Sequence, residues 1–248
     1  MIIRKSKAEI AKMRKAGRIV AETLRLMADA VRPGVTTGEL NRLAEAHIVK
    51  RGGKPAFKGY RGFPSSICTS VNEEVVHGIP GLRKLESGDI VGIDVGVALD
   101  GYYGDAAETF PVGKASPETM RLIAAAREAL AAGIDKCTSG NRLSDLSHAV
   151  QVKAEAAGFS VVREFVGHGI GRSMHEDPQI PNFGDPGKGP QLQAGMTFAI
   201  EPMITAGGYE VEILEDGWSV ITRDGSLSAH FEHTVAITEG RPEVLTAL

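Results

Sequence analysis

The sequence predicts an α+β fold in which two related halves share a curved antiparallel sheet backed by helices. Two observations lead to this prediction. Helix-like and strand-like stretches are grouped within each half instead of alternating strictly, and the pattern of the first half recurs in the second. The chain has 248 residues, of which 42% are hydrophobic, enough to fill a large core. No linker rich in proline, serine or charge divides it, so we expect a single domain over residues 1–248, with halves of roughly 1–112 and 113–248.

Two helices open the first half. Ser6-Lys-Ala-Glu9 is a capping box, and apolar residues keep helical spacing from Ile10 until Pro33-Gly34 ends the pattern. A second capping signal, Thr36-Thr-Gly-Glu39, begins a helix that stops near Gly52-Gly53. Strand-like stretches follow this pair of helices.

The second half repeats this order. One helix is expected from Ser116-Pro117-Glu118, where proline suits the first turn, and another from about Arg142 to Gly158. Adding 106 to the residue numbers matches helix to helix, and adding 107 matches strand to strand. Because the shift is maintained over three elements, we interpret it as an internal duplication, with a site expected between the halves. The matched positions include Glu22 and Glu128, Gly34 and Gly140, Glu39 and Asp145, Gly52 and Gly158, and segments 88–94 and 195–201.

Composition narrows the function classes. The formal net charge of -3 indicates neither a nucleic-acid-binding surface nor an acidic tail. The two cysteines, Cys68 and Cys137, form no CxxC motif, so a disulfide framework or a thiolate zinc site is not supported. There is no signal-peptide pattern and no apolar run long enough to span a bilayer. We therefore expect a cytoplasmic protein without a membrane or nucleic-acid partner.

Two aspartates in a predicted hairpin indicate a cation site. Asp94 lies in an apolar run that ends at Asp100-Gly101, the strongest short hairpin signal. A two-residue turn pairs Leu99 with Tyr102, and this register places Asp105 diagonally across from Asp94, about 7–8 Å away at Cα. Carboxylates at that spacing can converge on a cation. The alternative is that Asp94 caps a strand end and Asp105 is a solvated turn residue.

Two further acidic residues favour the cation. Glu201 and Glu232 are likewise embedded in strand-like apolar segments, both in the second half. Four carboxylates meeting in a dry cleft would repel one another and protonate, whereas two divalent ions would cancel their charges. The pattern of all four residues therefore predicts a site for two divalent ions.

Histidines add to the candidate chemistry. His168 stands between glycines that let the backbone approach closely and leave the imidazole unobstructed. His175 follows in a loop, a position compatible with a catalytic role. His47 and His148, on the second and fourth predicted helices, are interpreted as core or surface residues.

Ordered motifs over essentially the full chain resemble those of the type I methionine aminopeptidases, which share the pita-bread fold with creatinase and prolidase. Any one motif alone would be weak, but together they are highly specific. The matching segments are Tyr60-Arg-Gly-Phe-Pro-Ser-Ser-Ile-Cys68, Asn72-Glu-Glu-Val-Val-His-Gly-Ile-Pro80, Gly92-Ile-Asp94, Gly104-Asp105, Gly167-His-Gly-Ile-Gly171, Met174-His-Glu-Asp-Pro178, Ile200-Glu-Pro-Met203 and Phe231-Glu-His-Thr234.

The resemblance implies a single catalytic domain that removes the N-terminal methionine from nascent or newly made proteins and peptides, favouring a small second residue. Two divalent metal ions would be held by five residues. Asp105 and Glu232 would bridge both ions, Asp94 would complete one site, and His168 with Glu201 would complete the other. Oxygen ligands with one imidazole suit Mn(II), Fe(II) or Co(II), and zinc is a further candidate.

The same resemblance implies the catalytic roles. Two close cations would lower the pKa of a water between them, and Glu201 would shuttle its proton. His175 would stabilise the substrate carbonyl oxygen as it gains charge, and His77 would contact the substrate near the scissile nitrogen. The free amino group of the peptide would bind a metal, which explains cleavage from that end.

A methionine pocket is also implied, with an aromatic and sulfur-containing lining that suits a flexible thioether. Arg61 stands where some relatives carry histidine, and Met174 where some carry phenylalanine, so the pocket departs from the family pattern there. Without the resemblance, Phe63 and Trp218 would be ordinary core residues and Cys68 a small buried hydrophobe. The implied substrate-binding residues are Tyr60, Phe63, Cys68, His77, Met174, His175 and Trp218.

Two competing interpretations stay open. A proline-specific aminopeptidase or dipeptidase of the same fold would use similar ligands, but such relatives usually carry an additional amino-terminal domain, and the residues before Asp94 are already used by predicted helices and strands. An inactive pita-bread relative acting as a binding module would be expected to lose ligands, whereas all five positions are filled. The expected partners are peptide or nascent-protein N-termini, with the ribosome as a further candidate, and the expected state is a monomer.

Overall fold

A computed structural model describes residues 1–248 and has the α+β architecture that the sequence predicts. The helices are α1 (Lys7–Ala30), α2 (Thr37–Lys50), α3 (Pro117–Asp135) and α4 (Leu143–Ala156), with a 3-10 turn, η1, at Tyr60–Gly62. The strands are β1 (Lys54–Pro55), β2 (Cys68–Val71), β3 (Glu74–Val76), β4 (Ile90–Leu99), β5 (Tyr102–Pro111), β6 (Ser160–Val161), β7 (Gly167–Gly169), β8 (Glu176–Ile180), β9 (Thr197–Ile200), β10 (Met203–Thr205), β11 (Val211–Ile213), β12 (Val220–Thr222), β13 (Ser228–His230), β14 (His233–Ala236) and β15 (Glu243–Val244).

The helices begin at the capping signals of the sequence. The Ser6 and Thr36 side chains each accept a hydrogen bond from the amide three residues on, and Glu9 and Glu39 bond back to the caps. Both predicted capping boxes are therefore present. Ser116 caps α3, and proline occupies the first turn as expected. None of the helices combines the length and apolar character needed to cross a membrane.

The predicted hairpin is confirmed together with its register. β4 pairs with β5 in antiparallel fashion, with Leu99 opposite Tyr102 and Asp94 opposite Ala107. Asp105, two residues from Ala107 along β5, therefore lies diagonally across from Asp94 on the same face of the sheet. β1 and β2 pair with the other edge of β4. The two aspartates thus lie in the middle of a sheet and not in a solvated turn.

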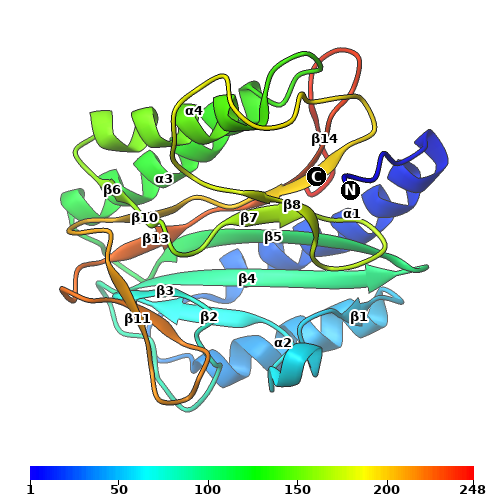
Figure 1. Ribbon diagram of the computed structural model, residues 1–248. Helices are drawn as coiled ribbons and strands as arrows, with labels where there is room; N and C mark the ends of the chain where they lie inside the picture. The colour runs from blue at the N-terminus through cyan, green and yellow to red at the C-terminus, as the bar shows by residue number, and fades with distance from the viewer.

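Backbone hydrogen bonds join this sheet to that of the second half, whose strand order is β15-β14-β9-β7-β8. Ala107 on β5 exchanges amide-to-carbonyl bonds of 2.9 and 3.3 Å with Glu232, and the amide of Tyr103 donates to the carbonyl of Gly171 at 2.9 Å. The two sheets meet along β5 and form one curved surface (Figure 1).

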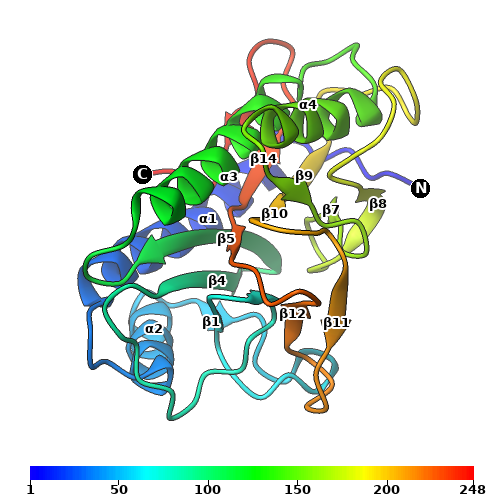
Figure 2. The same cartoon turned by 90° about the vertical axis from the view of Figure 1, so that its left-hand side faces the viewer.

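Helices cover one face of this surface. α1 packs on β4 and β5, and α3 packs on β9, β10 and β13, so the helices lie to one side and the β11–β12 hairpin to the other (Figure 2). Two apolar cores fill the space beneath the helices. The first includes Leu40 and Ile93, and the second includes Leu146 and Phe198. The opposite face of the sheet is left for loops and for a site.

The two halves correspond in detail. Adding 106 to the bounds of α2 gives those of α4, and both helices have 14 residues. Glycines at matching positions share a left-handed backbone, with φ of 89° at Gly34 and 101° at Gly140, and of 81° at Gly52 and 86° at Gly158. These correspondences support our proposal of an internal duplication within one domain, which stays a prediction.

Glu201 and Glu232 differ from the prediction in their local structure. The sequence pattern places both within strands, whereas Glu201 follows the end of β9 and Glu232 lies between β13 and β14. Because Pro202 has no amide hydrogen, the ladder between β9 and β14 cannot continue past Glu201. Both carboxylates therefore project from junctions between short strands.

Gly104 is expected to tolerate no side chain. α1 crosses β5 so closely that a Cβ at Gly104 would lie 2.7 Å from the backbone nitrogen of Gly17. Gly104→Ala should lower the free energy of unfolding by about 1–3 kcal/mol through overpacking, as measured by urea denaturation. Gly81→Ala is the control, because the nearest atom to its Cβ would be 4.0 Å away. Equal stability of the two variants would contradict the close packing.

Candidate metal centre

The residues that the sequence analysis marks for a site all line one cavity of about 250 Å³. Asp94 lies on β4, Asp105 on β5 and His168 on β7, while Glu201 and Glu232 come from the junctions after β9 and β13. Each half thus contributes carboxylates to the same space. The other predicted residues in the lining are Tyr60, Phe63, Cys68, His77, Met174, His175 and Trp218.

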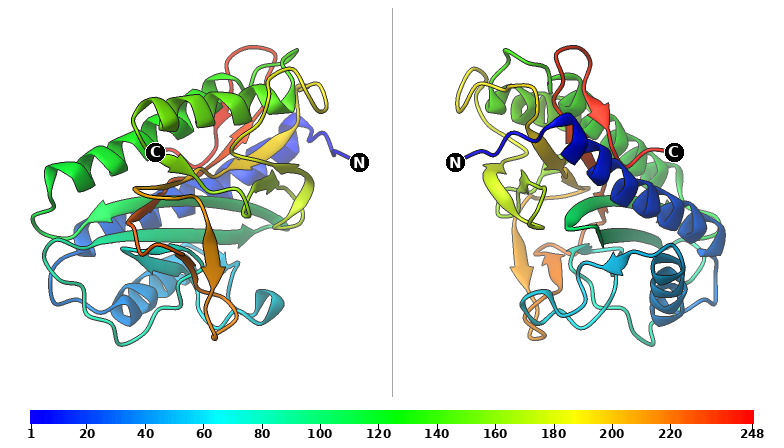
Figure 3. Two further views of the ribbon diagram at one scale, coloured as in Figure 1. Left: turned by 60° about the vertical axis from the view of Figure 1, so that its left-hand side comes forward. Right: turned by 90° about the vertical axis from the view of Figure 1, so that its right-hand side faces the viewer.

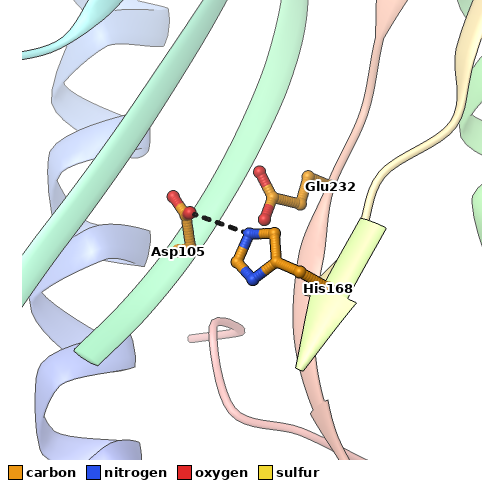
Figure 4. Close-up of side chains that lie close together, drawn as sticks. All are labelled: Asp105, His168 and Glu232. Carbon is orange, nitrogen blue, oxygen red and sulfur yellow. Dashed lines mark ion pairs between the residues drawn. The ribbon is translucent and has the colours of Figure 1, made fainter. Parts of the chain in front are cut away.

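The imidazole of His168 faces the carboxylates with an acceptor nitrogen. Its Nδ1 lies 2.8 Å from the carbonyl oxygen of Gly169 and donates to it, so Nε2 of the neutral ring carries a lone pair. Nε2 lies 3.5 Å from Glu201 Oε1 and 3.9 Å from Asp105 Oδ2. Figure 4 shows the side chains of Asp105, His168 and Glu232 converging. One candidate ligand atom from each lies within 4.8 Å of the other two. Acceptor atoms from both halves therefore face a common space.

Burial makes negative charge costly at these carboxyl groups. Asp105 and Glu232 are 4% and 2% exposed, and one oxygen of each, like Oδ1 of Asp94, is buried without a hydrogen-bond partner. Burial raises the pKa of Asp94 to about 7. Burial, reinforced by neighbouring carboxylates, raises the pKa of Asp105, Glu201 and Glu232. Burial also lowers the pKa of His168 to about 3, which keeps its ring neutral.

Divalent cations fit this set of donors. They would partner the unsatisfied oxygens and offset the repulsion that raises the pKa of the carboxyl groups. Carboxylate oxygens with one imidazole nitrogen suit Mn(II), Fe(II), Co(II) or Zn(II). Cys68 offers no competing thiolate, because burial raises the pKa of its thiol well above the ordinary value.

His175 and Tyr60 form one wall of the cavity. The Tyr60 hydroxyl lies 2.8 Å from His175 Nδ1, and the two rings stack with centroids 5.3 Å apart. The His175 ring also lies 4.2 Å from the ring of His168. Burial lowers the pKa of His175, and the positive charge of Arg61 lowers it further. His175 is therefore a neutral ring in a fixed orientation beside the acidic cluster.

An apolar pocket adjoins the acidic cluster. Phe63 and Trp218 meet edge to face with ring centroids 5.1 Å apart. Cys68 and Met174 are 4% and 2% exposed. Because Cys68 lies opposite Asp94 in the ladder between β2 and β4, the pocket and the carboxylates share a wall.

His77 contacts an aromatic residue that the sequence analysis did not assign. Its ring lies 6.3 Å from that of Trp218 and 5.8 Å from that of Phe165. Phe165 lies two residues before the Gly167–Gly171 motif that contains His168, so its closeness to that motif was the available signal. Burial lowers the pKa of His77 to about 4 and keeps it neutral.

Arg61, noted as a departure from the family pattern, lies at the rim of the cavity. Its φ is 49° and its guanidinium lies 5.4 Å from the centre of the Tyr60 ring.

His148 lies outside the lining of the cavity. Its Nδ1 lies 3.0 Å from the carbonyl oxygen of Gly184, in keeping with a structural role. Among the other lining residues that the sequence analysis did not assign, Val76 and Met203 lie within quoted motifs, and that position was a usable signal. Phe57, Glu164 and Val166 carried no signal beyond closeness to a motif.

An acidic cluster that fits divalent cations, beside an apolar side-chain pocket, defines a metal-dependent enzyme for substrates with an apolar group. The chain belongs to metallopeptidase family M24, whose model matches residues 11–239. This membership confirms the predicted pita-bread fold and hydrolase class.

Known proteins resemble the chain over its full length. The methionine aminopeptidase of Clostridium perfringens is 56% identical over 248 residues, which are 100% of both chains. Methionine aminopeptidase 1 of Bacillus subtilis is 53% identical over 99% of each chain. The crystal structure of methionine aminopeptidase from Thermotoga maritima matches with a TM-score of 0.98 and 48% identity over 100% of both chains. The prolidase of Pyrococcus furiosus, at 23% identity and a TM-score of 0.81 over 99% of this chain and 66% of its own, shares the fold alone.

Stabilisation by divalent ions should grow with pH. In the metal-free fold the pKa of Asp94 is raised from 3.8 to about 7. Its contribution to stability is therefore fully present below the unfolded pKa and is lost as the pH rises toward 7. Bound ions reverse this loss, since they bind the ionised carboxylates. We expect Mn(II) to raise Tm more at pH 8 than at pH 5.5, measured by calorimetry against chelator-treated protein.

The exposed Asp185 provides the control for this measurement. Asp185→Asn should show the same dependence on pH as the unmodified chain, because its side chain lies outside the cavity. A shift in Tm that is as large at pH 5.5 as at pH 8 would argue against the carboxyl cluster as the binding site.

Proposed function

We propose that the chain is a methionine aminopeptidase, which hydrolyses the first peptide bond of peptides and newly made proteins that begin with methionine and have a small second residue. The observation that carries this proposal is the buried cluster of acceptor atoms sharing a wall with an apolar, sulfur-containing pocket. The names of the relatives that match the full chain support the same activity.

The five converging residues would hold two divalent ions. Asp94 and Asp105 from the first half, and His168, Glu201 and Glu232 from the second, would each contribute a ligand atom. Bound ions would supply Lewis acidity toward the scissile carbonyl and lower the pKa of a water. Co(II), Mn(II), Fe(II) and Zn(II) are all candidates, since the donor set alone does not choose among them.

The protein side chains would move protons and orient the substrate. Burial, reinforced by the charges of Asp105 and Asp94, raises the pKa of Glu201, and its Oε1 lies 3.5 Å from His168 Nε2. Its carboxyl group would serve as the proton shuttle. When the Tyr60 hydroxyl donates to Nδ1 of His175, the proton on Nε2 is free to donate to the carbonyl oxygen as charge develops. His77, neutral and adjacent to the apolar pocket, would contact the substrate near the scissile nitrogen.

The apolar pocket would hold the first side chain of the substrate. Phe63, Trp218 and Tyr60 provide aromatic surfaces, and Cys68 and Met174 provide polarisable sulfur, which suits the thioether of methionine. Sulfur and aromatic surfaces make favourable contacts at about 5 Å between sulfur and ring.

We further propose that the enzyme is cytoplasmic and monomeric. Contact with the ribosome stays a prediction.

Proline-specific cleavage is the second candidate, because prolidases share the fold. The deciding experiment measures release of the first residue from Met-Ala-Ser and Ala-Pro-Ser peptides, using metal-free protein reloaded with single divalent ions. We expect metal-dependent release of methionine and a rate on Ala-Pro-Ser at least about 100-fold lower. The long side chain of methionine can fill the apolar pocket, whereas the methyl group of alanine cannot. Faster release from Ala-Pro-Ser would favour the proline-specific enzyme, and no release from either would favour a binding module.

Dependence on the carboxyl cluster is tested with Asp105→Asn in the same assay. The substitution removes a charge that would help to hold the ions, so metal content and rate should both fall while the folded structure survives. Metal content is measured after dialysis, with Asp185→Asn as the matched exposed control. A variant that keeps full turnover would refute the ligand assignment.

His175→Ala should lower kcat and kcat/KM by about 100-fold or more, with a small change in substrate binding, because its hydrogen bond strengthens as charge develops on the carbonyl oxygen. His148→Ala is the control, since His148 lies on α4, outside the cavity, and its Nδ1 bonds to the carbonyl of Gly184. A change confined to KM would count against a role in the transition state.

A further inference from the structure

A buried ion pair lies behind the wall that carries His175. Lys5 Nζ contacts Glu176 Oε2 across 171 residues of sequence, and the two side chains are only 3% and 8% exposed. Most other ion pairs of the chain have partners that are substantially exposed. The low exposure of both partners distinguishes this pair from those surface pairs.

Glu176 closes the loop between β7 and β8. Its second carboxylate oxygen, Oε1, accepts hydrogen bonds from the amides of Arg172 at 2.7 Å and Ser173 at 3.2 Å. The loop enclosed by these bonds carries Met174 and His175, which line the cavity. One carboxylate thus fixes the backbone just before both residues.

Hydrogen bonds to two backbone carbonyl groups also fix the position of Lys5, the other partner of the ion pair. Its amide donates to the carbonyl of Gly195 at 2.6 Å, and its Nζ also reaches the carbonyl of Ile3 at 3.3 Å. A Cβ at Gly171 would lie 2.3 Å from Lys5 Cε and 2.7 Å from Glu176 Oε1, so the pair is packed directly against the backbone of the loop. Figure 3 shows the amino-terminal segment running beside this part of the chain.

A contribution to the free energy of folding does not explain such a pair. Removing two charges from water costs about as much free energy as their mutual attraction provides, so a buried pair often stabilises the fold no more than well-packed apolar residues would. Its directional bonds instead fix one geometry, and here that geometry is the path of residues 172–175. His175 has one further polar anchor, the Tyr60 hydroxyl, on a separate loop.

We propose that Lys5 and Glu176 are positioning residues, which hold the loop so that His175 points at the scissile carbonyl and Met174 shapes the methionine pocket. The inference rests on the proposed aminopeptidase function. Glu176 acts through the two loop amides, and Lys5 acts by neutralising and orienting the Glu176 carboxylate. Neither residue touches the cavity.

The test is a double-mutant cycle on a Met-Ala-Ser peptide. Glu176→Gln, and the double variant Lys5→Met with Glu176→Gln, should lower kcat by about 10-fold to 100-fold while KM changes less than about threefold, since small displacements of a catalytic group are costly. In a His175→Ala background the same changes should lower kcat by less than about twofold, because the group they position is absent. Metal content should stay unchanged throughout.

A merely structural role predicts a different pattern. The losses would then multiply in the His175→Ala background, or appear in metal content and Tm instead of kcat, and either result would overturn the proposal. The double variant keeps the test decisive if a single variant fails to fold, because it leaves no charge buried alone. Glu128→Gln, which breaks the exposed pair with Lys153, is the matched control and should leave kcat unchanged.

Hydrogen exchange separates this proposal from the proposed function. The amides of Arg172 and Ser173 should exchange at least about tenfold faster in the double variant than in the unmodified chain, whichever peptide is cleaved. Unchanged exchange at these amides would overturn the positioning role even if methionine is released. Absence of methionine release by the unmodified chain would overturn the proposed function and leave the exchange result to decide the anchoring of the loop.

Discussion

The constraint on which the structure depends is the burial of four carboxyl groups and one neutral imidazole around a common space. Bringing these groups together costs free energy in the metal-free fold, as the raised pKa of Asp94 and its neighbours shows. The two apolar cores must offset this cost. Bound cations would lower the free energy cost of bringing the carboxyl groups together, so occupancy of the site and stability of the fold are linked.

The meeting of the halves along β5 makes the cluster possible. The Thr234 hydroxyl accepts a hydrogen bond from the amide of Asp105 at 3.0 Å and donates to its carbonyl at 2.8 Å. Ala107 and Glu232 exchange backbone bonds beside them. Thr234 of the second half thus positions Asp105 of the first half, and Ala107 of the first half positions Glu232 of the second. Neither half could form the site alone, because each provides only part of the ligand set and part of the backbone that orients it.

Local signals in the sequence predict a large part of this arrangement. Capping boxes define the starts of α1 and α2, and Asp100-Gly101 defines the register that brings Asp94 near Asp105. The junctions at Glu201 and Glu232 were predicted as strands, because an apolar run looks the same whether or not its ladder is interrupted by closure of the halves. The roles of the converging residues stay predictions, although their assembly in one cavity is observed.

The pair formed by Lys5 and Glu176 shows why some functional residues leave no local signal. A lysine near the start of a chain and a glutamate in a loop are each ordinary, and only closure of the tertiary structure makes them partners. Their burial matters because the loop they hold carries a group expected to act in the transition state, where tolerance for displacement is smallest. Residues that bind metal must present the right chemical groups, and that requirement is visible in sequence. Residues that orient a loop need only the right geometry, which many side chains could supply, so the structure is needed to find them.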